Sequence, residues 1–331
     1  METKSITVAG AGILGLWQAL TLAKAGHKVR LLEASVEPFS NAASRWAGAM
    51  LAPDCEAESA PAVVRDLGRE AMALWRAVYP GIVENGTLVV ASARDQSELQ
   101  RFARATERHK QVDEAAIADL EPSLGGRFQA GLFFSGEAHF NAMAALGYLL
   151  EEARRAGVTF ESGEKWQDGR DGLTIDCRGF SARDDVQDLR GVRGERLVVR
   201  STEVSLRRPV RLLHPRQPIY VVPQGDGRFV VGATVIERED DGPMTVRSAL
   251  ELLGSAYALH PAFAEAEVLD MGAGVRPAFP DNVPRVEIAG YGRVIRVNGA
   301  YRHGFLLAPV LAQAVAQFVA TGARAHPLIA A

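Results

Sequence analysis

The sequence has 331 residues, 47% of them hydrophobic and 23% charged, and a formal net charge of −3. This length is typical of about two domains, and the slightly acidic balance without a basic tail excludes a nucleic-acid partner. Two cysteines, Cys55 and Cys177, are too few for a disulfide framework or a cysteine-ligated zinc site. We find no run of about 18 apolar residues and no signal peptide, so we expect no membrane-spanning helix and a cytoplasmic location. The sequence does not decide whether the chain forms a homo-oligomer.

The chain begins with a pattern typical of a β–α–β unit. Residues 5–9 are rich in β-branched side chains and predict a strand, residues 16–25 predict a helix that Gly26 ends, and residues 27–33 predict a second strand. Parallel strands joined through a helix belong to one sheet. Further helices are predicted at residues 67–78, 95–109, 143–156, 246–257 and 306–320, and further strands at residues 86–92, 173–176, 197–200, 210–213, 219–222, 229–233 and 293–298.

Between the first predicted strand and helix, Gly10, Gly12 and Gly15 fit the pattern GxGxxG. The first glycine allows a tight turn, the second lets the backbone approach a pyrophosphate, and the third lets the helix pack closely on the strand. The helix N-terminus offers free N–H groups to that pyrophosphate. Glu33 ends the second strand, where a carboxylate can accept hydrogen bonds from both ribose hydroxyls and disfavours a 2′-phosphate. The motif therefore predicts NAD or FAD and does not separate them.

The order of the elements predicts two domains, with the second inserted into the first in pieces. Short strands between residues 197 and 233, separated by Pro and Gly turns, predict an antiparallel sheet apart from the first unit. The last strand and the long apolar helix return to the first domain. We expect the dinucleotide-binding domain to comprise residues 1–82, 136–192 and 268–331, and the substrate domain to comprise residues 83–135 and 193–267.

Several later segments carry a resemblance to a known family. Residues 41–53 are rich in small side chains, which would let a loop pass close to a flat ring system. With the later motifs, this loop resembles the D-amino-acid oxidase family of flavoproteins, and within it the glycine oxidase branch, over essentially the whole chain. The motifs stand in the family's order at residues 213–216 (LHPR), 219–223 (IYVVP), 231–234 (VGAT), 274–277 (GVRP) and 300–309 (AYRHGFLLAP).

The resemblance implies an α/β fold in which an FAD-binding Rossmann-like domain carries an inserted antiparallel-sheet substrate domain. It implies non-covalent FAD and the oxidative deamination of glycine or a similar small amino acid or amine, with a link to thiamine biosynthesis. A hydride would pass to the flavin, the imine would hydrolyse to a 2-oxo acid and ammonia, and O₂ would reoxidise the flavin to give hydrogen peroxide.

The same resemblance implies roles for individual residues. Arg276 would hold the substrate carboxylate, Tyr220 would donate a second hydrogen bond to it, and Arg302 is a further catalytic candidate. Apart from the resemblance, we take Ala52 and Val235 as candidates for residues near the substrate's α-carbon, and we expect no metal. The cofactor-binding residues would be Gly10, Gly12, Ile13, Leu14, Gly15, Glu33, Ala34, Ser44, Ala47, Gly48, Ala49, Met50, Leu51, Gly274, His303, Gly304, Phe305 and Leu306.

The chain departs from the family's pattern in two places. The family usually has Ala-Ala-Gly-Met-Leu where this chain has Gly48 before Ala49, and residues 134–143 also differ from the usual form. These departures do not change the expected fold, but they leave the identity of the substrate undecided. The C-terminal third contains no cysteine, which argues against the covalent flavin of the related sarcosine oxidases.

The residue types suit this chemistry. A guanidinium can hold a carboxylate through two parallel N–H bonds, which fixes its rotation as well as its position. Hydride transfer needs only the neutral amine, so we expect His303 to have a positional role and not to act as a general base. A helix that starts near Leu306 would direct its N-terminus toward the negative charge of reduced flavin.

Three alternatives stay open on the sequence. The first is a broader D-amino-acid oxidase or dehydrogenase of the same class. The second is an NAD-dependent dehydrogenase, which would be colourless when purified. The third is a non-enzymatic dinucleotide-binding redox sensor, which would show no turnover and would not need Arg276. The preferred substrate, the electron acceptor and the oligomeric state are likewise open.

Overall fold

The predicted β–α–β unit forms the centre of a six-stranded sheet in the computed structural model, which describes residues 3–167 and 172–330. The strand order is β15-β16-β9-β1-β2-β8, and every neighbouring pair is parallel except β15 and β16. A parallel sheet needs cover on its faces, and helices supply it. The strands are β1 (Ser5–Ala9), β2 (Lys28–Glu33), β8 (Thr159–Ser162), β9 (Leu173–Asp176), β15 (Arg285–Ala289) and β16 (Val294–Asn298).

Four helices belong to this part of the molecule: α1 (Ile13–Lys24), α3 (Ala62–Val78), α6 (Ala142–Arg155) and α8 (Gly304–Thr321). Helix α1 packs against both α6 and α8, and α3 packs against α8. The buried side chains of β1, α1, α3, α6 and α8 form one hydrophobic core. Segments from both ends of the chain therefore share this core, as the sequence predicted for the last strand and helix.

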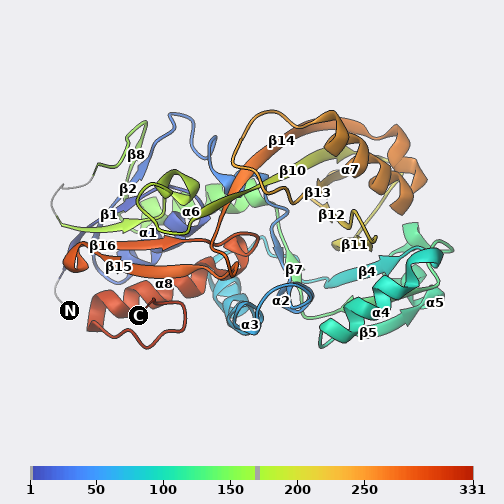
Figure 1. Cartoon of the computed structure of the whole chain (residues 1–331), viewed down its shortest axis with the longest axis horizontal. Coiled ribbons are helices and arrows are strands. Elements are labelled where there is room, and N and C mark those ends of the chain that lie inside the picture. Colours follow the sequence, from blue (N-terminus) through green and yellow to red (C-terminus); the bar gives the residue numbers. More distant parts are fainter. Residues whose placement is uncertain (1–2, 168–171, 331) are drawn as a thin grey trace.

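The second sheet has eight strands in the order β14-β10-β13-β12-β11-β4-β6-β5. Its neighbouring strands are antiparallel except for β11 and β4, which pair in parallel. Figure 1 shows this sheet with α4, α5 and α7 at one end of the molecule, and the six-stranded sheet with α8 at the other. The bounds are β4 (Thr87–Ala91), β5 (Lys110–Asp113), β6 (Ala130–Phe134), β10 (Arg190–Arg200), β11 (Val210–Leu213), β12 (Ile219–Pro223), β13 (Arg228–Gly232), β14 (Glu267–Ala278), α4 (Gln96–Ala105), α5 (Glu114–Leu120) and α7 (Val246–Leu259).

Short elements connect the two sheets. The 3-10 helix η1 (Ala43–Trp46) leads into β3 (Met50–Leu51), which pairs with β7 (Ala138–His139), and α2 (Pro53–Glu56) follows β3. The segment 43–56 thus carries the small-residue loop from the first sheet toward the second.

Strand β14 is longer than any strand predicted from the sequence, which indicated no strand there. Its pattern is interrupted by Gly272 and Gly274, residues that weaken a strand signal. The structure gives the reason for both glycines. The ring of Trp46 lies against them, so that an added Cβ would approach it to 2.1 Å at Gly272 and 2.7 Å at Gly274.

Helix α8 corrects the expectation that no apolar run of membrane-spanning length exists. It has 18 residues with a mean hydropathy of 1.6, which is long and apolar enough by composition. The structure places 61% of that window in the protein interior, where it packs on α1 and α3. A helix that is hydrophobic on nearly all sides is also typical of a protein core.

Candidate functional site

The glycine loop joins β1 to α1 with very little space for side chains. Gly10 has φ of 95°, and an added Cβ would lie 2.6 Å from the carbonyl oxygen of Cys177. An added Cβ at Gly15 would lie 1.8 Å from the carbonyl oxygen of Gly10. Helix α1 begins at Ile13, earlier than predicted, with Gly12 as its N-cap. The helix N-terminus therefore stands at the loop itself, as a pyrophosphate site requires.

Glu33 and Ser44 bind this loop directly. One carboxylate oxygen of Glu33 accepts a hydrogen bond from the Ala11 amide at 3.2 Å, and the other accepts from the amide and hydroxyl of Ser35 at 3.0 and 2.7 Å. The Ser44 hydroxyl accepts from the Ile13 amide at 3.1 Å. Each carboxylate oxygen can accept more than one hydrogen bond, so Glu33 can still accept a hydrogen bond from a ribose hydroxyl.

A cavity of about 1100 Å³ connects the loop to the second sheet. It is lined by residues 40–44 and 46–50, by the N-terminal end of α8 and by parts of β12 and β14. It brings together most of the residues predicted for the site: Gly10, Gly12, Ile13, Leu14, Glu33, Ala34, Ser44, Ala47, Gly48, Ala49, Met50, Tyr220, Val235, Gly274, Arg276, Arg302, His303, Gly304, Phe305 and Leu306. The shape and the bare backbone of the loop fit a dinucleotide such as FAD.

Three predicted residues lie outside the lining of this cavity. Gly15 packs against Gly10, in agreement with its predicted role in helix–strand packing. Leu51 is fully buried in the core and pairs with Ala138 of β7, and Ala52 is buried beside it. The structure thus gives Leu51 and Ala52 packing contacts beneath the site.

Arg276 of β14 and Tyr220 of β12 both line the cavity, although β10 and β13 lie between their strands in the second sheet. The Arg276 guanidinium donates a hydrogen bond to the carbonyl oxygen of Thr234 at 3.1 Å. Removal from water lowers the pKa of Arg276, Tyr220 opposes this effect, and Arg302 adds to it. An arginine nevertheless stays charged in proteins. Within the described residues, no carboxylate forms an ion pair with Arg276.

Glu56 is a cavity residue that the sequence patterns did not indicate. Its carboxylate is buried and lies 3.6 Å from Arg302, 3.7 Å from Arg211 and 3.4 Å from the Nδ1 atom of His303. Burial raises the pKa of Glu56, but Arg302, His303 and Arg211 outweigh burial and the net pKa is lowered. A single glutamate in a helical turn carries no sequence signal for this role. The fold brings Arg302 and Arg211 close to Glu56, and these two cations give its carboxylate a positively charged environment.

His303 occupies the N-cap position of α8 and is buried. Burial lowers the pKa of His303 to about 4, although Glu56 opposes this shift. The imidazole is therefore neutral near pH 7. Trp75 fixes the start of the helix, because its indole N–H donates to the carbonyl oxygen of Phe305 at 2.8 Å. The N-terminus of α8 is held against the cavity, which suits the stabilisation of negative charge.

The structure also accounts for the unusual order of Gly48 and Ala49. Ala49 has φ of 51°, a left-handed conformation that glycine adopts more readily and that costs alanine roughly 1–2 kcal/mol. Gly48 stands where the phenol of Tyr220 touches the backbone. The chain therefore places its glycine at the close contact and an alanine at the strained position.

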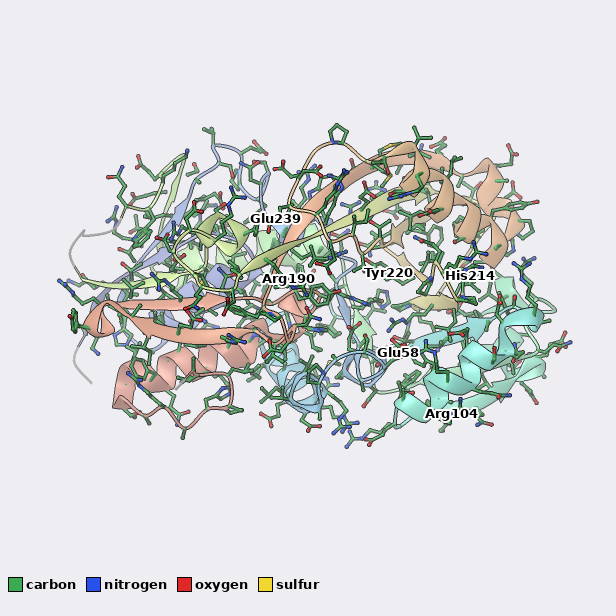
Figure 2. All side chains as sticks on the ribbon, in the orientation of Figure 1. Glu58, Arg104, Arg190, His214, Tyr220 and Glu239 are labelled. Atoms are coloured by element: carbon green, nitrogen blue, oxygen red, sulfur yellow. The ribbon has the colours of Figure 1, made fainter. Side chains whose placement is uncertain are left out.

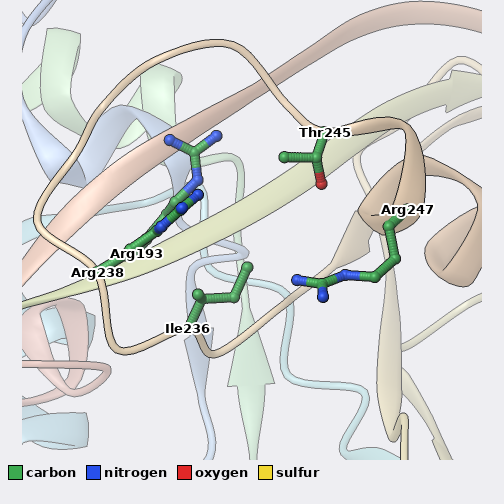
Figure 3. Close-up of a pocket in the computed structure, with 5 residues that line it drawn as sticks. All are labelled: Arg193, Ile236, Arg238, Thr245 and Arg247. Atoms are coloured by element: carbon green, nitrogen blue, oxygen red, sulfur yellow. The ribbon is translucent and has the colours of Figure 1, made fainter.

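A second, smaller cavity of about 450 Å³ lies elsewhere, at β10 and the start of α7 (Figure 3). Arg193, Ile236, Arg238, Thr245 and Arg247 line it, and none of them was predicted for the site. The guanidinium of Arg193 binds Glu195 at 2.8 Å and Asp240 at 2.6 Å. These bonds give Arg193 a structural role.

Comparisons with known proteins agree with this geometry. A model of the FAD-dependent oxidoreductase family (DAO) matches residues 5–318. A Rhizobium etli protein with the provisional name thiamine biosynthesis oxidoreductase ThiO is 53% identical over 323 residues, which is 96% of each chain. A glycine oxidase of Pseudomonas aeruginosa is 25% identical over 364 residues, covering 96% of this chain and 95% of its own. The crystal structure of glycine oxidase from Geobacillus kaustophilus superimposes with a TM-score of 0.82 at 22% identity, over 98% of this chain and 97% of that one, which shows the shared fold.

Proposed function

The chain belongs to the FAD-dependent oxidoreductase family (DAO), and on that premise we propose that it oxidatively deaminates glycine or similar small amino acids and amines. The cofactor is FAD, and the donor group is an amine. The alternative of an NAD-dependent enzyme is thereby excluded. We further propose O₂ as the electron acceptor, hydrogen peroxide as a product and a place in thiamine biosynthesis, in line with the ThiO and glycine oxidase relatives.

The observation that carries this proposal is the difference between three of the arginines that line the cavity, Arg211, Arg276 and Arg302. Arg302 and Arg211 both face the carboxylate of Glu56, at 3.6 and 3.7 Å. Among the described residues, Arg276 donates to the carbonyl oxygen of Thr234 and to no carboxylate. A buried cation without a carboxylate is costly. A substrate carboxylate would supply the missing anionic partner of Arg276. Tyr220 lines the same cavity and would donate a second hydrogen bond to that carboxylate.

The residues around the cavity would divide the remaining work. Bound FAD would supply the redox chemistry, by accepting a hydride from the substrate's α-carbon. Arg276 and Tyr220 would fix the substrate's carboxylate and thereby orient the α-carbon. The N-terminus of α8 would stabilise negative charge. His303 is neutral and buried, so its role would be to shape the end of α8 beside Glu56.

We also propose the division into two domains, with residues 1–82, 136–192 and 268–331 binding FAD and residues 83–135 and 193–267 covering the substrate. The pairing of β14 with β10 favours moving residues 267–278 to the second domain.

A cytoplasmic location is proposed as well, because Cys55 and Cys177 are buried, unpaired thiols.

The test is a purification followed by a substrate screen. The protein should be yellow and release FAD on mild denaturation. Glycine, sarcosine and D-alanine should give hydrogen peroxide, whereas simple amines without a carboxylate should react poorly. Preference among small substrates should be graded, because an added methylene typically changes discrimination by about 1–3 kcal/mol.

The alternatives give different results in the same screen. A yellow protein that turns over none of the donors would support the redox sensor. Bulky D-amino acids that outperform glycine by a large factor would support the broader D-amino-acid oxidase, and turnover only with an artificial acceptor would support a dehydrogenase. A protein that neither contains nor takes up FAD would contradict the proposal.

A further inference from the structure

The phenol of Tyr220 is enclosed by two glycines. An added Cβ at Gly48 would lie 2.7 Å from Cε2, 3.2 Å from Cζ and 3.4 Å from the hydroxyl oxygen of Tyr220. An added Cβ at Gly232 would lie 2.7 Å from the same hydroxyl oxygen, 2.8 Å from Cζ and 2.9 Å from Cε2. Both glycines therefore touch the hydroxyl end of the ring. Neither has a positive φ that would by itself explain a glycine.

The two glycines come from different parts of the fold. Gly232 ends β13 and pairs directly with Tyr220 of β12, so the phenol lies over its strand neighbour. Gly48 belongs to the loop between η1 and β3, which lines the cavity next to the dinucleotide loop. Figure 2 shows Tyr220 of the second sheet on the side toward the middle of the molecule. Its hydroxyl position thus depends on how closely the loop approaches the sheet.

Arg276, the partner of Tyr220 in the proposed carboxylate site, is seated in the same way. An added Cβ at Gly194 of β10 would lie 2.0 Å from the guanidinium carbon of Arg276. Gly194 pairs with Gly274 across β10 and β14, two residues from Arg276 along β14. The Tyr220 phenol and the Arg276 guanidinium, which are the two hydrogen-bond donors of the proposed site, therefore both pack against the backbone of glycine residues.

We propose that Gly48 and Gly232 are positioning residues, which set the Tyr220 hydroxyl for the substrate's carboxylate by leaving no side chain on either side of the phenol. The inference rests on the proposed function, since it assigns Tyr220 to carboxylate binding. An alanine at either position must displace the ring until the contact reaches ordinary van der Waals distance. The hydroxyl lies at the end of the ring and moves with it, and displacements of this size weaken a hydrogen bond steeply.

The experiment compares Gly48→Ala and Gly232→Ala with the parent, each with FAD bound. Glycolate, a carboxylate without an amine, is titrated against the oxidised enzyme and followed by the flavin absorption. Glycine oxidation gives kcat and KM separately. Loss of one hydrogen bond to a charged group corresponds to roughly a 10- to 100-fold change. We expect glycolate affinity and kcat/KM for glycine to fall by about 10-fold or more in both variants, mainly through KM.

A double-mutant cycle distinguishes positioning from a general structural effect. In the Tyr220→Phe background the ring is still displaced but no hydroxyl is lost, so Gly48→Ala should change glycolate affinity by less than about threefold. Gly254→Ala on α7 is the matched control, because an added Cβ there meets nothing within 4 Å. If Gly48→Ala does not retain FAD, Gly232→Ala, which lies outside the cavity lining, provides the measurement.

Two results overturn the inference. One is a parent that oxidises glycine while both glycine variants keep its glycolate affinity, and this result leaves the proposed function intact. The other is a Gly48→Ala effect of equal size with and without the Tyr220 hydroxyl. A parent that binds FAD and turns over no amino acid contradicts the proposed function and the inference together.

Discussion

Three of the arginines that line the cavity, Arg211, Arg276 and Arg302, differ in their neighbours. Arg302 and Arg211 share the carboxylate of Glu56, which holds them in place. Arg276 lies over Gly194 and donates only to a backbone carbonyl among the described residues. Residue type alone does not separate these arginines. The availability of a carboxylate within the protein separates them, and this difference supports the proposal that Arg276 holds the substrate's carboxylate.

Arg276→Lys should keep the charge and lose the planar fork of the guanidinium. A hydrogen bond to a charged group is worth roughly 1.5–3 kcal/mol, and each 1.4 kcal/mol is about tenfold in rate. We expect kcat/KM for glycine to fall on the order of 10- to 100-fold, and further for Arg276→Ala. Steady-state kinetics with peroxide detection measures this loss.

The control for this prediction is Arg247→Lys, at an exposed arginine of α7, which should leave kinetics unchanged. The flavin spectrum of Arg276→Lys should match that of the parent. Near-full activity of Arg276→Ala with FAD bound would show that another group holds the carboxylate, with Arg302 as the next candidate.

At the level of elements, the dinucleotide site depends on how closely α1 approaches β1. The carbonyl oxygen of Gly10 occupies the space where a side chain at Gly15 would begin. The Gly10 amide is bonded to the Leu32 carbonyl of β2 at 2.8 Å, so the loop cannot move aside freely. The same two glycines therefore set the packing of the first strand, the first helix and the second strand.

Gly15→Ala should separate α1 from β1 and weaken FAD binding. Overpacking of a rigid contact costs roughly 1–3 kcal/mol, and the 1.8 Å approach places this substitution at the upper end. The measurements are the FAD content after purification and the thermal midpoint with and without added FAD.

Gly147→Ala in α6 is the comparison for that helix substitution, because an added Cβ there meets nothing within 4 Å. It should be neutral or stabilising by about 0.5–1 kcal/mol, since alanine favours a helix over glycine. If Gly15→Ala behaves like Gly147→Ala, the close approach is not important for the site.

At the scale of the molecule, a buried carboxylate lies where the connecting helix α2 meets the second sheet. Glu137 stands in the unusual segment 134–143, and its Oε1 atom accepts a hydrogen bond from the Cys55 amide at 2.7 Å. Burial raises the pKa of Glu137 to about 7, while Thr87, Cys55 and Arg211 oppose the shift. The carboxyl group therefore titrates in the folded protein near neutral pH.

This pKa has a consequence for stability. Between about pH 4.5 and pH 7 the folded state keeps a proton that the unfolded state releases, so the contribution is fully present below pH 4.5 and is lost as the pH rises through 7. The full difference is at most about 3 kcal/mol. Glu137→Gln, which keeps the acceptor for Cys55, should flatten the decline in stability between pH 5 and 8. Denaturant unfolding at a series of pH values measures this.

His139 and His303 act in the opposite direction, because burial lowers the pKa of each to about 4. Their contribution is lost as the pH falls from 6.5 toward 4, in both the parent and the variant. The quantity to compare is therefore the difference between the two curves. Glu251→Gln, at an exposed position on α7, should leave the curve unchanged. Equal slopes for the parent and Glu137→Gln above pH 5 would contradict the prediction.

The sequence by itself predicted a dinucleotide site at the GxGxxG turn, and it predicted the first strands and helix and the C-terminal helix in their observed order. The GxGxxG turn, the first strands and the C-terminal helix are local patterns, since hydrophobic periodicity and glycine conformation act over a few neighbouring residues. Strand β14 could not be predicted in this way, because its glycines accommodate the ring of Trp46, which lies far away in the chain.

Only the tertiary structure decided the environment of the cavity. The sequence does not indicate that Glu56 meets Arg211 and Arg302, that Tyr220 lies between Gly48 and Gly232, or that Glu137 is buried against Cys55. Each of these contacts joins segments distant in sequence, so its energy depends on packing and on removal from water. Burial and partners set the charge state of a carboxylate or an imidazole, and both are properties of the folded chain.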